Sequence, residues 1–283
     1  LGCAQLHAAV TAWSALGARA GWQGETLWIE GAGLTGLTAP RGALECARSP
    51  RLLAQLAAVI SAQRFGTRLL LSGGGAARHA PMEQVVGVLR ARGAQIAGSG
   101  RESEGLRAPL AIAPLLSGEQ LRPIDANLLF ADPLAKDALL LSGLFASGPT
   151  TLSEPQVSSD HLERLYVALG LPLRRVGSVV AFDVQAWDRR LPALGAQRLP
   201  GSATLAAHLA ALVQWLPGSD LTLRDVSINP TRNGVLDVLR SWGGALNVVP
   251  TGDAALREPV ADVRVRPAAI RGGVVDAELL VRS

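Results

Sequence analysis

Residues able to bind an anion gather at the start of one predicted helix. Ser49 followed by Pro50 is typical of an N-cap residue and a proline in the first helical turn. Arg48 and Arg51 place two positive charges at the same helix end, where the helix dipole also attracts negative charge. Pro50 removes one backbone donor from this end. We interpret Ser49, Arg48 and Arg51 as a candidate site for a phosphate or a carboxylate.

A second candidate for anion binding is the glycine run Gly73-Gly74-Gly75. Closely spaced glycines let the backbone N–H groups approach a bound anion. The run is not followed by the Lys-Ser/Thr pair that ends a nucleotide-binding P-loop. The sequence therefore supports an anion-binding loop here, but not a P-loop.

The histidines and cysteines do not predict a metal site. The four histidines are far apart in the sequence, and the two cysteines form no CxxC pair. We assign no metal, no cofactor and no catalytic residue, and we expect Cys46, at the end of a predicted strand, to be a buried apolar residue. His161 stands at a predicted helix start, where it is either a structural residue or a base. Both interpretations of His161 stay open.

Composition excludes several classes of partner. The 283 residues carry a net charge of only +4, and no dense run of arginines alternates with aromatic residues, so we expect no nucleic acid. The longest apolar stretch, around residues 138–145, is far shorter than the ~20 residues of a membrane span. No signal peptide is visible after Leu1. We expect a cytoplasmic protein that does not bind membranes.

A fourfold repeat must position these residues. Predicted helices close at Gly17, Gly93, Gly170 and Gly243, at intervals of 76, 77 and 73 residues. Solenoid repeats are shorter, at about 20 to 50 residues. The regular interval therefore favours stacked α/β units of about 75 residues that build domains.

The hydrophobic pattern also predicts the elements inside a repeat. Between the second and third closing glycines, it predicts a strand at 110–113, a helix at 137–145, a strand at 150–152 and a helix at 161–169. The helix-strand-helix part of this order recurs over 49–92 and again over 203–242. The predicted helices and strands thus recur together in the same order.

Several motifs resemble the 5-enolpyruvylshikimate-3-phosphate (EPSP) synthase family of the enolpyruvyl transferase superfamily. Residues 220–243 contain Asn229-Pro-Thr-Arg232, similar to the family's Asn-Pro-Thr-Arg-x-Gly segment before a helix. Residues 138–155 and the following Ser158-Ser-Asp-His-Leu-Glu163 match further segments in the family's order. Pro81-Met82 resembles its Arg-Pro-Met helix. The resemblance covers nearly the whole chain, in a divergent form.

The resemblance implies a fold and a division into domains. It implies an α/β protein with inverse α/β barrel-type domains, built from repeated β-α-β-α-β-β units. Residues 1–195 would form most of the domain that binds shikimate phosphate, as about three units with the first incomplete. Residues 196–283 would form the first unit of the second domain. By this comparison the chain lacks both ends of the family's usual length.

The resemblance also implies a reaction and the residues that contact its substrates. The family transfers an enolpyruvyl group from phosphoenolpyruvate to a hydroxyl of shikimate 3-phosphate, a step of aromatic amino-acid biosynthesis. Its partners would be these two small anions. The residues that would contact them by resemblance and by charge are Ser49, Ser158, His161, Arg48, Arg51 and Arg78.

Many polar positions of the family's motifs are replaced in this chain. Ala80 stands where the family has the arginine before Pro-Met, and Arg78 lies two residues earlier. Asp132 replaces the serine of Ser-Ala-Gln-Val-Lys, and Ser159 replaces the arginine of Ser-Arg-Asp-His. Ser202 replaces the carboxylate of Pro-Gly-Asp-x-Ser. Such joint losses are typical of a site under relaxed constraint.

Two functions therefore stay open from the sequence. The first is an EPSP synthase-like transferase. The second is a catalytically inert relative that serves as a pseudoenzyme or an interaction module. UDP-N-acetylglucosamine enolpyruvyl transferase is disfavoured, because residues 73–81 contain no cysteine. An incomplete second domain would also expose apolar surface, so we expect self-association or a partner at that surface.

Overall fold

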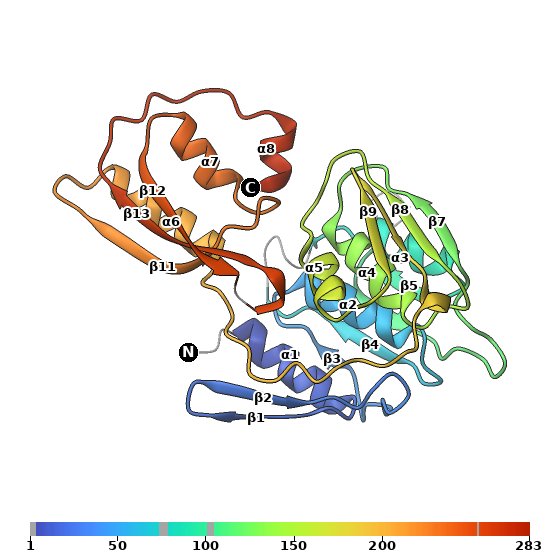
Figure 1. Ribbon diagram of the computed structural model, residues 1–283. Coiled ribbons are helices and arrows are strands. Elements are labelled where there is room, and N and C mark those ends of the chain that lie inside the picture. Colours follow the sequence, from blue (N-terminus) through green and yellow to red (C-terminus); the bar gives the residue numbers. More distant parts are fainter. Residues whose placement is uncertain (1–3, 74–78, 101–104, 254) are drawn as a thin grey trace. The chain divides into compact units, whose positions relative to one another are not determined.

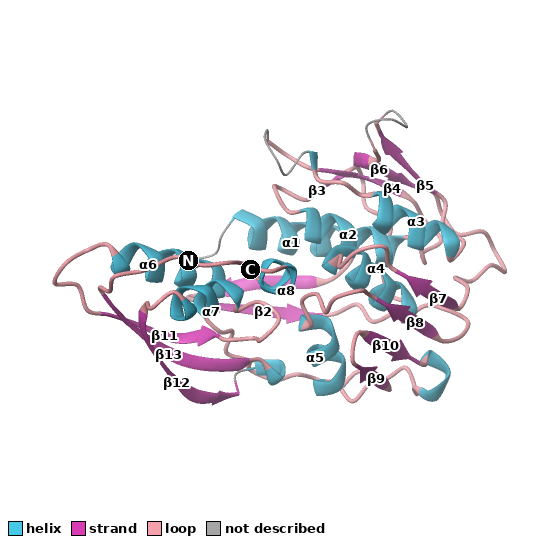
Figure 2. Cartoon of the chain, turned by 90° about the horizontal axis from the view of Figure 1, so that it is seen from above, coloured by secondary structure: helices cyan, strands magenta, loops and turns pink. Residues whose placement is uncertain are grey.

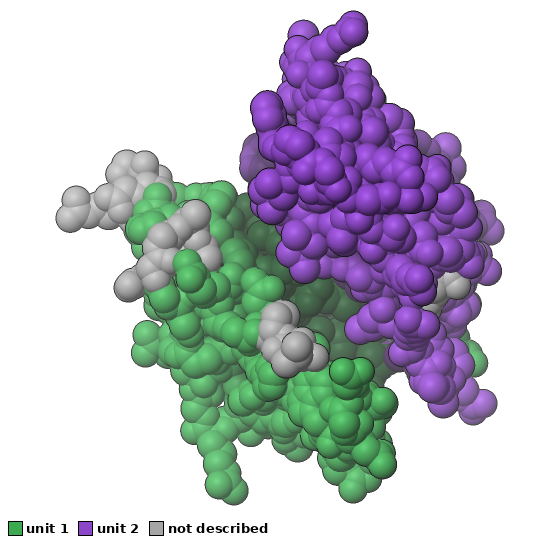
Figure 3. All heavy atoms as spheres, turned by 90° about the vertical axis from the view of Figure 1, so that its left-hand side faces the viewer, with its two compact units in different colours: residues 1–128, 132–153, 179–188 green, residues 129–131, 154–178, 189–283 purple. Residues whose placement is uncertain are grey.

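The computed structural model describes residues 4–73, 79–100, 105–253 and 255–283 (Figure 1). These residues form two compact units (Figure 3). Unit 1 comprises residues 1–128, 132–153 and 179–188, and unit 2 comprises residues 129–131, 154–178 and 189–283. None of the described helices is both long enough and apolar enough to cross a membrane.

Two complete copies of the predicted β-α-β-α-β-β order follow one another in the sequence. The first consists of β3 (Leu44–Glu45), α2 (Pro50–Ile60), β4 (Thr67–Leu70), α3 (Glu83–Ala91), β5 (Ile96–Ser99) and β6 (Arg107–Ile112). The second consists of β7 (Ile124–Asn127), α4 (Pro133–Gly143), β8 (Thr150–Ser153), α5 (His161–Ala168), β9 (Leu173–Val176) and β10 (Val179–Phe182). The repeat found in the sequence is therefore a repeat of secondary structure.

Incomplete copies flank these two. The N-terminal copy has α1 (Ala4–Ala15), β1 (Arg19–Gln23) and β2 (Thr26–Glu30). The C-terminal copy has α6 (Ala203–Gln214), β11 (Leu221–Ser227), α7 (Gly234–Ser241), β12 (Ala245–Asp253), β13 (Pro259–Arg266) and then α8 (Ala277–Arg282). In place of its first strand, only Gly201 pairs in parallel with Val226 of β11. In the last copy, the first strand is thus reduced to one isolated β-bridge among the described residues.

One predicted strand has a different place in the repeat. The strand predicted at 110–113 as the first of its repeat is β6, the last strand of the preceding copy. The first strand is β7, whose alternating sequence Ile-Asp-Ala-Asn has only two apolar residues. The hydrophobic pattern located the strand but could not show which repeat it belongs to.

The strands are ordered alike in each copy. In unit 1 one sheet has the order β3-β4-β6-β5, with β3 and β4 parallel and β6 antiparallel to both of its neighbours. The strands β7, β8 and β10 repeat the first part of this order. In unit 2 the order β11-β13-β12 repeats its last part, and α6 and α7 cover one face of that sheet (Figure 2).

Local sequence sets the helix ends. Ser49 accepts a hydrogen bond from the backbone N–H of Leu52 at 3.1 Å, which confirms the predicted N-cap of α2. Asp132 caps α4 in the same way, again before a proline. The closing glycines have positive φ angles, for example +104° at Gly93 and +93° at Gly243. These values are the left-handed conformation that a helix C-terminus favours in glycine.

The core of unit 1 forms where the helices of successive repeats meet. Helices α2 and α4 pack against each other, and most of their residues are buried. In unit 2 the apolar core joins the inner face of α6 to β11 and β13 through Ala206, Ala210, Val263 and Val265. Each unit therefore has its own core.

The two units do not follow the predicted domains residue by residue. Unit 2 contains residues 154–178 in addition to 189–283, whereas the prediction placed the boundary at 195. The contacts define compact units, not the folding domains of the family. The division into 1–195 and 196–283 stays a prediction.

Candidate functional site

The anion-binding candidates of unit 1 lie beyond the carboxyl ends of two neighbouring strands. β3 and β4 run parallel, so the loops that follow them begin at the same edge of the sheet. The loops are held together by two backbone hydrogen bonds, from Cys46 N to Leu70 O at 2.8 Å and from Ser72 N to Ala47 O at 2.7 Å. Parallel pairing thus places Arg48 beside Gly73.

The side chain of Arg48 lies beside Gly73. A Cβ atom built on Gly73 would lie 3.5 Å from the Cγ and Cδ atoms of Arg48, and Gly73 has a φ of +82°. A side chain there would therefore meet the arginine stem at an ordinary contact distance, whereas the positive φ is a conformation that other residues rarely adopt. Gly74 and Gly75, the rest of the predicted anion-binding glycine run, lie outside the described residues.

A hollow of about 340 Å³ opens next to this contact. It is lined by Glu45, Leu70, Leu71, Ser72, Gly73, Ala108 and Pro109. The hydroxyl of Ser72 donates to Glu45 Oε2 at 2.5 Å, so one wall carries a carboxylate. An anion in this region would be favoured toward the Arg48 side and repelled on the Glu45 side.

Ser49 has a defined structural role as the cap of α2. Its oxygen accepts from Leu52, and its backbone N–H donates to Cys46 O at 3.0 Å. Accepting a hydrogen bond does not consume the hydroxyl proton, which can still be donated to an anion. The substrate-binding role predicted for Ser49 is compatible with capping and stays a prediction.

Arg51 points to a carboxylate that the sequence did not reveal. Its Nη1 lies 3.1 Å from Asp137 Oδ2 on α4, and Gln55 donates to the same oxygen. The Asp137 side chain is 1% exposed and that of Arg51 is 34% exposed. Because a buried carboxylate offsets much of its charge, Arg51 would attract an anion less strongly than the sequence alone predicts.

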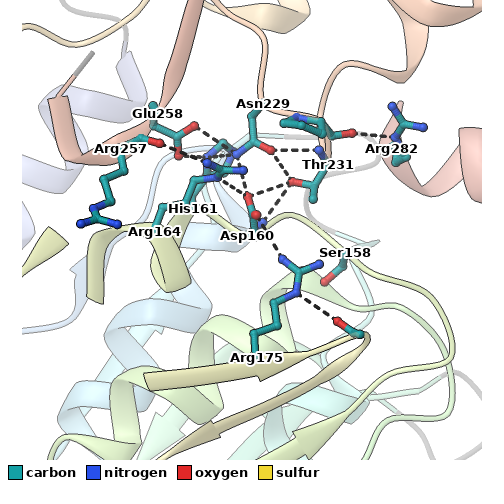
Figure 4. A network of polar contacts seen from close by, with 12 residues as sticks. Ser158, Asp160, His161, Arg164, Arg175, Asn229, Thr231, Arg257, Glu258 and Arg282 are labelled. Carbon is teal, nitrogen blue, oxygen red and sulfur yellow. Dashed lines mark hydrogen bonds and ion pairs between the residues drawn. The ribbon is translucent and has the colours of Figure 1, made fainter. Parts of the chain in front are cut away.

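The remaining predicted contacts are distributed as follows. Arg78 lies outside the described residues. Ser158 is buried at 1% exposure, and its backbone N–H donates to Glu154 Oε1 at 2.9 Å. His161 begins α5 and belongs to a polar network of unit 2 (Figure 4).

Asp160 is the centre of that network. One carboxylate oxygen accepts from Arg164 Nε at 2.8 Å and from Asn229 Nδ2 at 2.7 Å, and the other accepts from Arg175 Nη1 at 3.1 Å. The residue is 5% exposed. Burial by itself would raise the pKa of Asp160, but the hydrogen bonds from Arg164 and Asn229 and the nearby arginine charges hold that pKa below its ordinary value.

Two motifs of the sequence meet at this carboxylate. Asn229 and Thr231, of the Asn-Pro-Thr-Arg segment, lie 69 and 71 residues from Asp160 in the chain. Asn229 Oδ1 accepts from the backbone N–H of Thr231 at 2.9 Å, and the Asp160 backbone N–H donates to Thr231 Oγ1 at 3.1 Å. The turn at Asn229 is thereby tied to the start of α5.

Glu258 completes the network from a third segment. His161 Nδ1 lies 2.7 Å from Glu258 Oε1, and Asn229 Nδ2 donates to Glu258 Oε2 at 3.0 Å. Burial by itself would raise the pKa of Glu258, but its contacts with His161 and Asn229 hold that pKa below its ordinary value. The structural interpretation of His161 is thus supported by its contacts.

The network suits a structural role better than anion binding. Its two carboxylates, Asp160 and Glu258, are paired with cationic or N–H donors from Arg164, Arg175 and Asn229. An incoming phosphate would have to displace these carboxylates from their donors, which costs their charge-assisted hydrogen bonds. The network can hold three chain segments in place and can orient His161.

Sequence reasoning did not place Asn229, Thr231, Glu258, Arg164 or Arg175 in a site. A signal existed for the first two, because they belong to the motif that carried the family resemblance. Arg164 stands four residues after Asp160, and this i,i+4 spacing at a helix start is itself a sequence signal for an ion pair. Glu258 and Arg175 lie in no such motif, and their place in the network depends on the tertiary fold.

Cys46 has the buried environment predicted for it. It is 0% exposed, and burial, with a smaller contribution from the charge of Glu45, raises its pKa to about 12. A thiol with so high a pKa is not a nucleophile at neutral pH. Among the residues that the structure describes, no group of three or more His, Cys, Asp or Glu could hold a metal ion.

Comparison with known proteins gives one consistent family. The model of the family "EPSP synthase (3-phosphoshikimate 1-carboxyvinyltransferase)" matches residues 1–280. The 3-phosphoshikimate 1-carboxyvinyltransferase of Citrifermentans bemidjiense is 34% identical over 278 residues, which cover 98% of this chain and 61% of that protein. The one from Synechococcus sp. strain RCC307 is 40% identical over 260 residues, which cover 90% and 56%.

Solved structures agree with these relatives. EPSP synthase from Acinetobacter baumannii has a TM-score of 0.80 and 29% identity to this chain, and the match covers 100% of this chain and 61% of that one. The predicted inverse α/β barrel-type fold is confirmed by this likeness. The chain spans about three-fifths of the length of these relatives. It belongs to the EPSP synthase family.

Proposed function

We propose that this chain acts in the transfer of a carboxyvinyl group from phosphoenolpyruvate to 3-phosphoshikimate. The observation that carries the proposal is the family match over residues 1–280, together with relatives whose names all state this activity. In this reaction the oxygen of a substrate hydroxyl forms a bond to the carbon of phosphoenolpyruvate that carries the phosphate, the bond between that carbon and the phosphate oxygen breaks, and the hydroxyl proton is balanced by the inorganic phosphate that leaves. The substrates are small anions, and neither nucleic acid nor a membrane is part of the proposal.

Unit 1 supplies the residues that we propose to contact an anionic substrate. Arg48 lies against Gly73, and Ser49 caps α2 beside it. An arginine beside a helix N-terminus combines a permanent positive charge with N–H donors, which suits a phosphate or a carboxylate. We assign Arg48 as the main contact and Ser49 as a second donor, with Arg51 weakened by Asp137.

We also propose, from the family resemblance, that Ser158, His161 and Arg78 contact a substrate. Ser158 is buried, so direct contact with a substrate would require it to act from within a packed region, whereas the side chain of His161 is 39% exposed but pairs with Glu258. Arg78 follows the glycine run in sequence. The cytoplasmic location expected from the sequence also stays a prediction.

The proposal is tested by incubating the purified chain with 3-phosphoshikimate and phosphoenolpyruvate. Inorganic phosphate is measured continuously, and the carboxyvinyl product is measured by mass spectrometry. We expect phosphate and product to form in equal amounts, and only when both substrates are present. Arg48→Ala should lower the rate, whereas Arg41→Ala, another exposed arginine of unit 1, should not.

The possible results separate the transferase from an inert relative. Equal release of phosphate and product supports the proposal. Binding of 3-phosphoshikimate without any product would overturn the catalytic part of the proposal. Absence of both binding and product, with the chain folded by circular dichroism, would overturn it entirely.

A further inference from the structure

The first residue of β6 lies at the same edge of its sheet as the anion-binding candidates. β6 runs antiparallel to β4, with Leu110 opposite Leu69. Because β4 is parallel to β3, the start of β6 lies at the edge where both of those strands end (Figure 2). Ala108 and Pro109 of β6 line the hollow of about 340 Å³. Arg107, which precedes Ala108 in the chain, therefore stands beside the hollow.

The side chain of Arg107 reaches the segment before α3. Its Nη1 lies 3.5 Å from Nδ1 of the exposed His79. The same segment is tied to the residue before Arg107, because the backbone N–H of Met82 donates to Leu106 O at 2.8 Å. Ala80, directly after His79, stands at the position where the family's motif has an arginine before Pro-Met. The guanidinium of Arg107 thus lies next to a position at which this chain lacks one.

The guanidinium of Arg107 has donors available for a ligand. Its contact with His79, at 3.5 Å, is near the outer limit of a hydrogen bond. A guanidinium carries five N–H donors, so this contact uses few of them. Arg51 differs, because its Nη1 lies 3.1 Å from the buried carboxylate of Asp137. Within the described part of the chain, no carboxylate forms an ion pair with Arg107.

The charges around the hollow favour an anion only if more than one arginine acts on it. Glu45 lines the hollow, and its carboxylate would repel a phosphate or a carboxylate. Arg48, beside Gly73, offsets that charge. A phosphate group carries nearly two negative charges at neutral pH, so a single arginine leaves the balance unfavourable. A second guanidinium at the start of β6 adds both positive charge and N–H donors.

We propose that Arg107 takes the place of the arginine that the family carries before Pro-Met, and that Arg107 and Arg48 together bind an anionic group of a substrate. Phosphoenolpyruvate and 3-phosphoshikimate each carry a phosphate and a carboxylate, and a guanidinium can donate two parallel hydrogen bonds to either group. The identity of the ligand rests on the proposed transferase function. The binding of an anion at this edge does not.

Titration calorimetry of the chain tests this role with phosphoenolpyruvate, 3-phosphoshikimate and inorganic phosphate, each added alone. We expect Arg107→Ala to weaken the binding of at least one of the two substrates by about tenfold or more. Arg107→Lys should weaken it less, because lysine keeps the charge but loses the paired donors. Arg41→Ala is the matched control. Arg41 is exposed near the opposite edge of the sheet, since the neighbouring Gly42 O accepts from Thr67 at the start of β4.

A double variant tests whether one arginine has replaced the other. Ala80→Arg in the Arg107→Ala background restores a guanidinium next to His79, and we expect it to recover most of the lost affinity. Circular dichroism confirms that each variant is folded before it is titrated. A double variant that binds no better than Arg107→Ala would overturn the replacement of the family's arginine by Arg107.

The three ligands separate this inference from the proposed function. If the parent chain binds inorganic phosphate but neither substrate, and Arg107→Ala weakens that binding, the anion site is supported and the proposed transferase fails. If Arg107→Ala binds every ligand of the parent chain with unchanged affinity, the inference is overturned and the proposed transferase stands. A parent chain that binds none of the three ligands would overturn both.

Discussion

Two polar regions of the molecule differ in how their charged groups are exposed and paired. They are the loops that follow β3 and β4, and the network around Asp160. In the first region, exposed Arg48 lies over a glycine beside an open hollow. In the second, a buried carboxylate is saturated by donors from three chain segments. The first presents a positive charge near a hollow, whereas the second can accept a ligand only by breaking its own carboxylate contacts.

This difference explains which parts of the family's motifs are retained. Asp160, His161, Asn229 and Thr231 match the family's motifs, and all four belong to the buried network. The replaced positions include Ala80, in the segment before α3, and Ser202, exposed at the start of α6. Residues that join distant segments are costly to change because each loss leaves a buried partner unsatisfied. The motif residues that this chain shares with the family are therefore mainly those that hold distant chain segments together.

The largest effect is expected from removing the centre of the network. Asp160→Ala leaves Arg164, Arg175 and Asn229 without their shared acceptor, and breaking a buried pair costs about 3–5 kcal/mol. Urea unfolding should show this loss in the free energy of unfolding. Glu25→Gln, in an exposed turn, should change it by less than about 0.5 kcal/mol. An Asp160 variant as stable as the control would contradict the structural role.

The same network should make stability depend on acid pH. The folded-state pKa values of Asp160 and Glu258 are lowered, so their stabilising contribution is present above the unfolded pKa values near 4. It is lost as the pH falls through the lower, folded values. Tm measured from pH 6 to 2.5 should fall more steeply for the parent chain than for Asp160→Asn. Parallel curves for the two proteins would show that Asp160 does not contribute.

Arg48 should affect ligand binding more than stability. Arg48→Ala removes the charge next to the hollow, and we expect about tenfold weaker binding of 3-phosphoshikimate, or about 1.4 kcal/mol. Its free energy of unfolding should stay close to that of the parent chain because the side chain is exposed. Titration calorimetry of Arg48→Ala and Arg41→Ala separates the two arginines. Equal affinities would show that the ligand does not use Arg48.

The smallest effect is expected at Gly73. Gly73→Ala forces a Cβ onto a φ of +82°, at a cost of about 1 kcal/mol, while the contact of 3.5 Å with Arg48 is an ordinary one. We expect a fall in Tm of a few degrees. Gly87→Ala is a suitable control, because a Cβ there meets nothing within 4 Å and Gly87 lies inside α3. It should be neutral or slightly stabilising.

The sequence predicted the repeated helices and strands better than it predicted which residues contact one another. The repeat was visible because each copy ends a helix in a glycine of positive φ, and this local requirement recurs at Gly93, Gly170 and Gly243. The first strand of the third copy was missed, because β7 has only two apolar residues in four. Local patterns report what each segment buries, not which repeat it joins.

The site was predicted only where the chemistry is local. Ser49 as a cap and its neighbours Arg48 and Arg51 could be found from adjacent residues. The pairing of Arg51 with Asp137 joins residues 86 positions apart, and the contact of His161 with Glu258 joins residues 97 positions apart. Such partners are brought together by packing between repeats. The sequence alone carries no short-range signal for them.

Thermal unfolding of the chain with and without 3-phosphoshikimate tests the central proposal most directly. A ligand at a hundred times its dissociation constant stabilises the folded state by about 2.7 kcal/mol. We predict a clear rise in Tm with millimolar 3-phosphoshikimate, reduced in Arg48→Ala and unchanged in Arg41→Ala. An unchanged Tm of the parent chain at millimolar ligand would contradict substrate recognition and, with it, the proposed transferase.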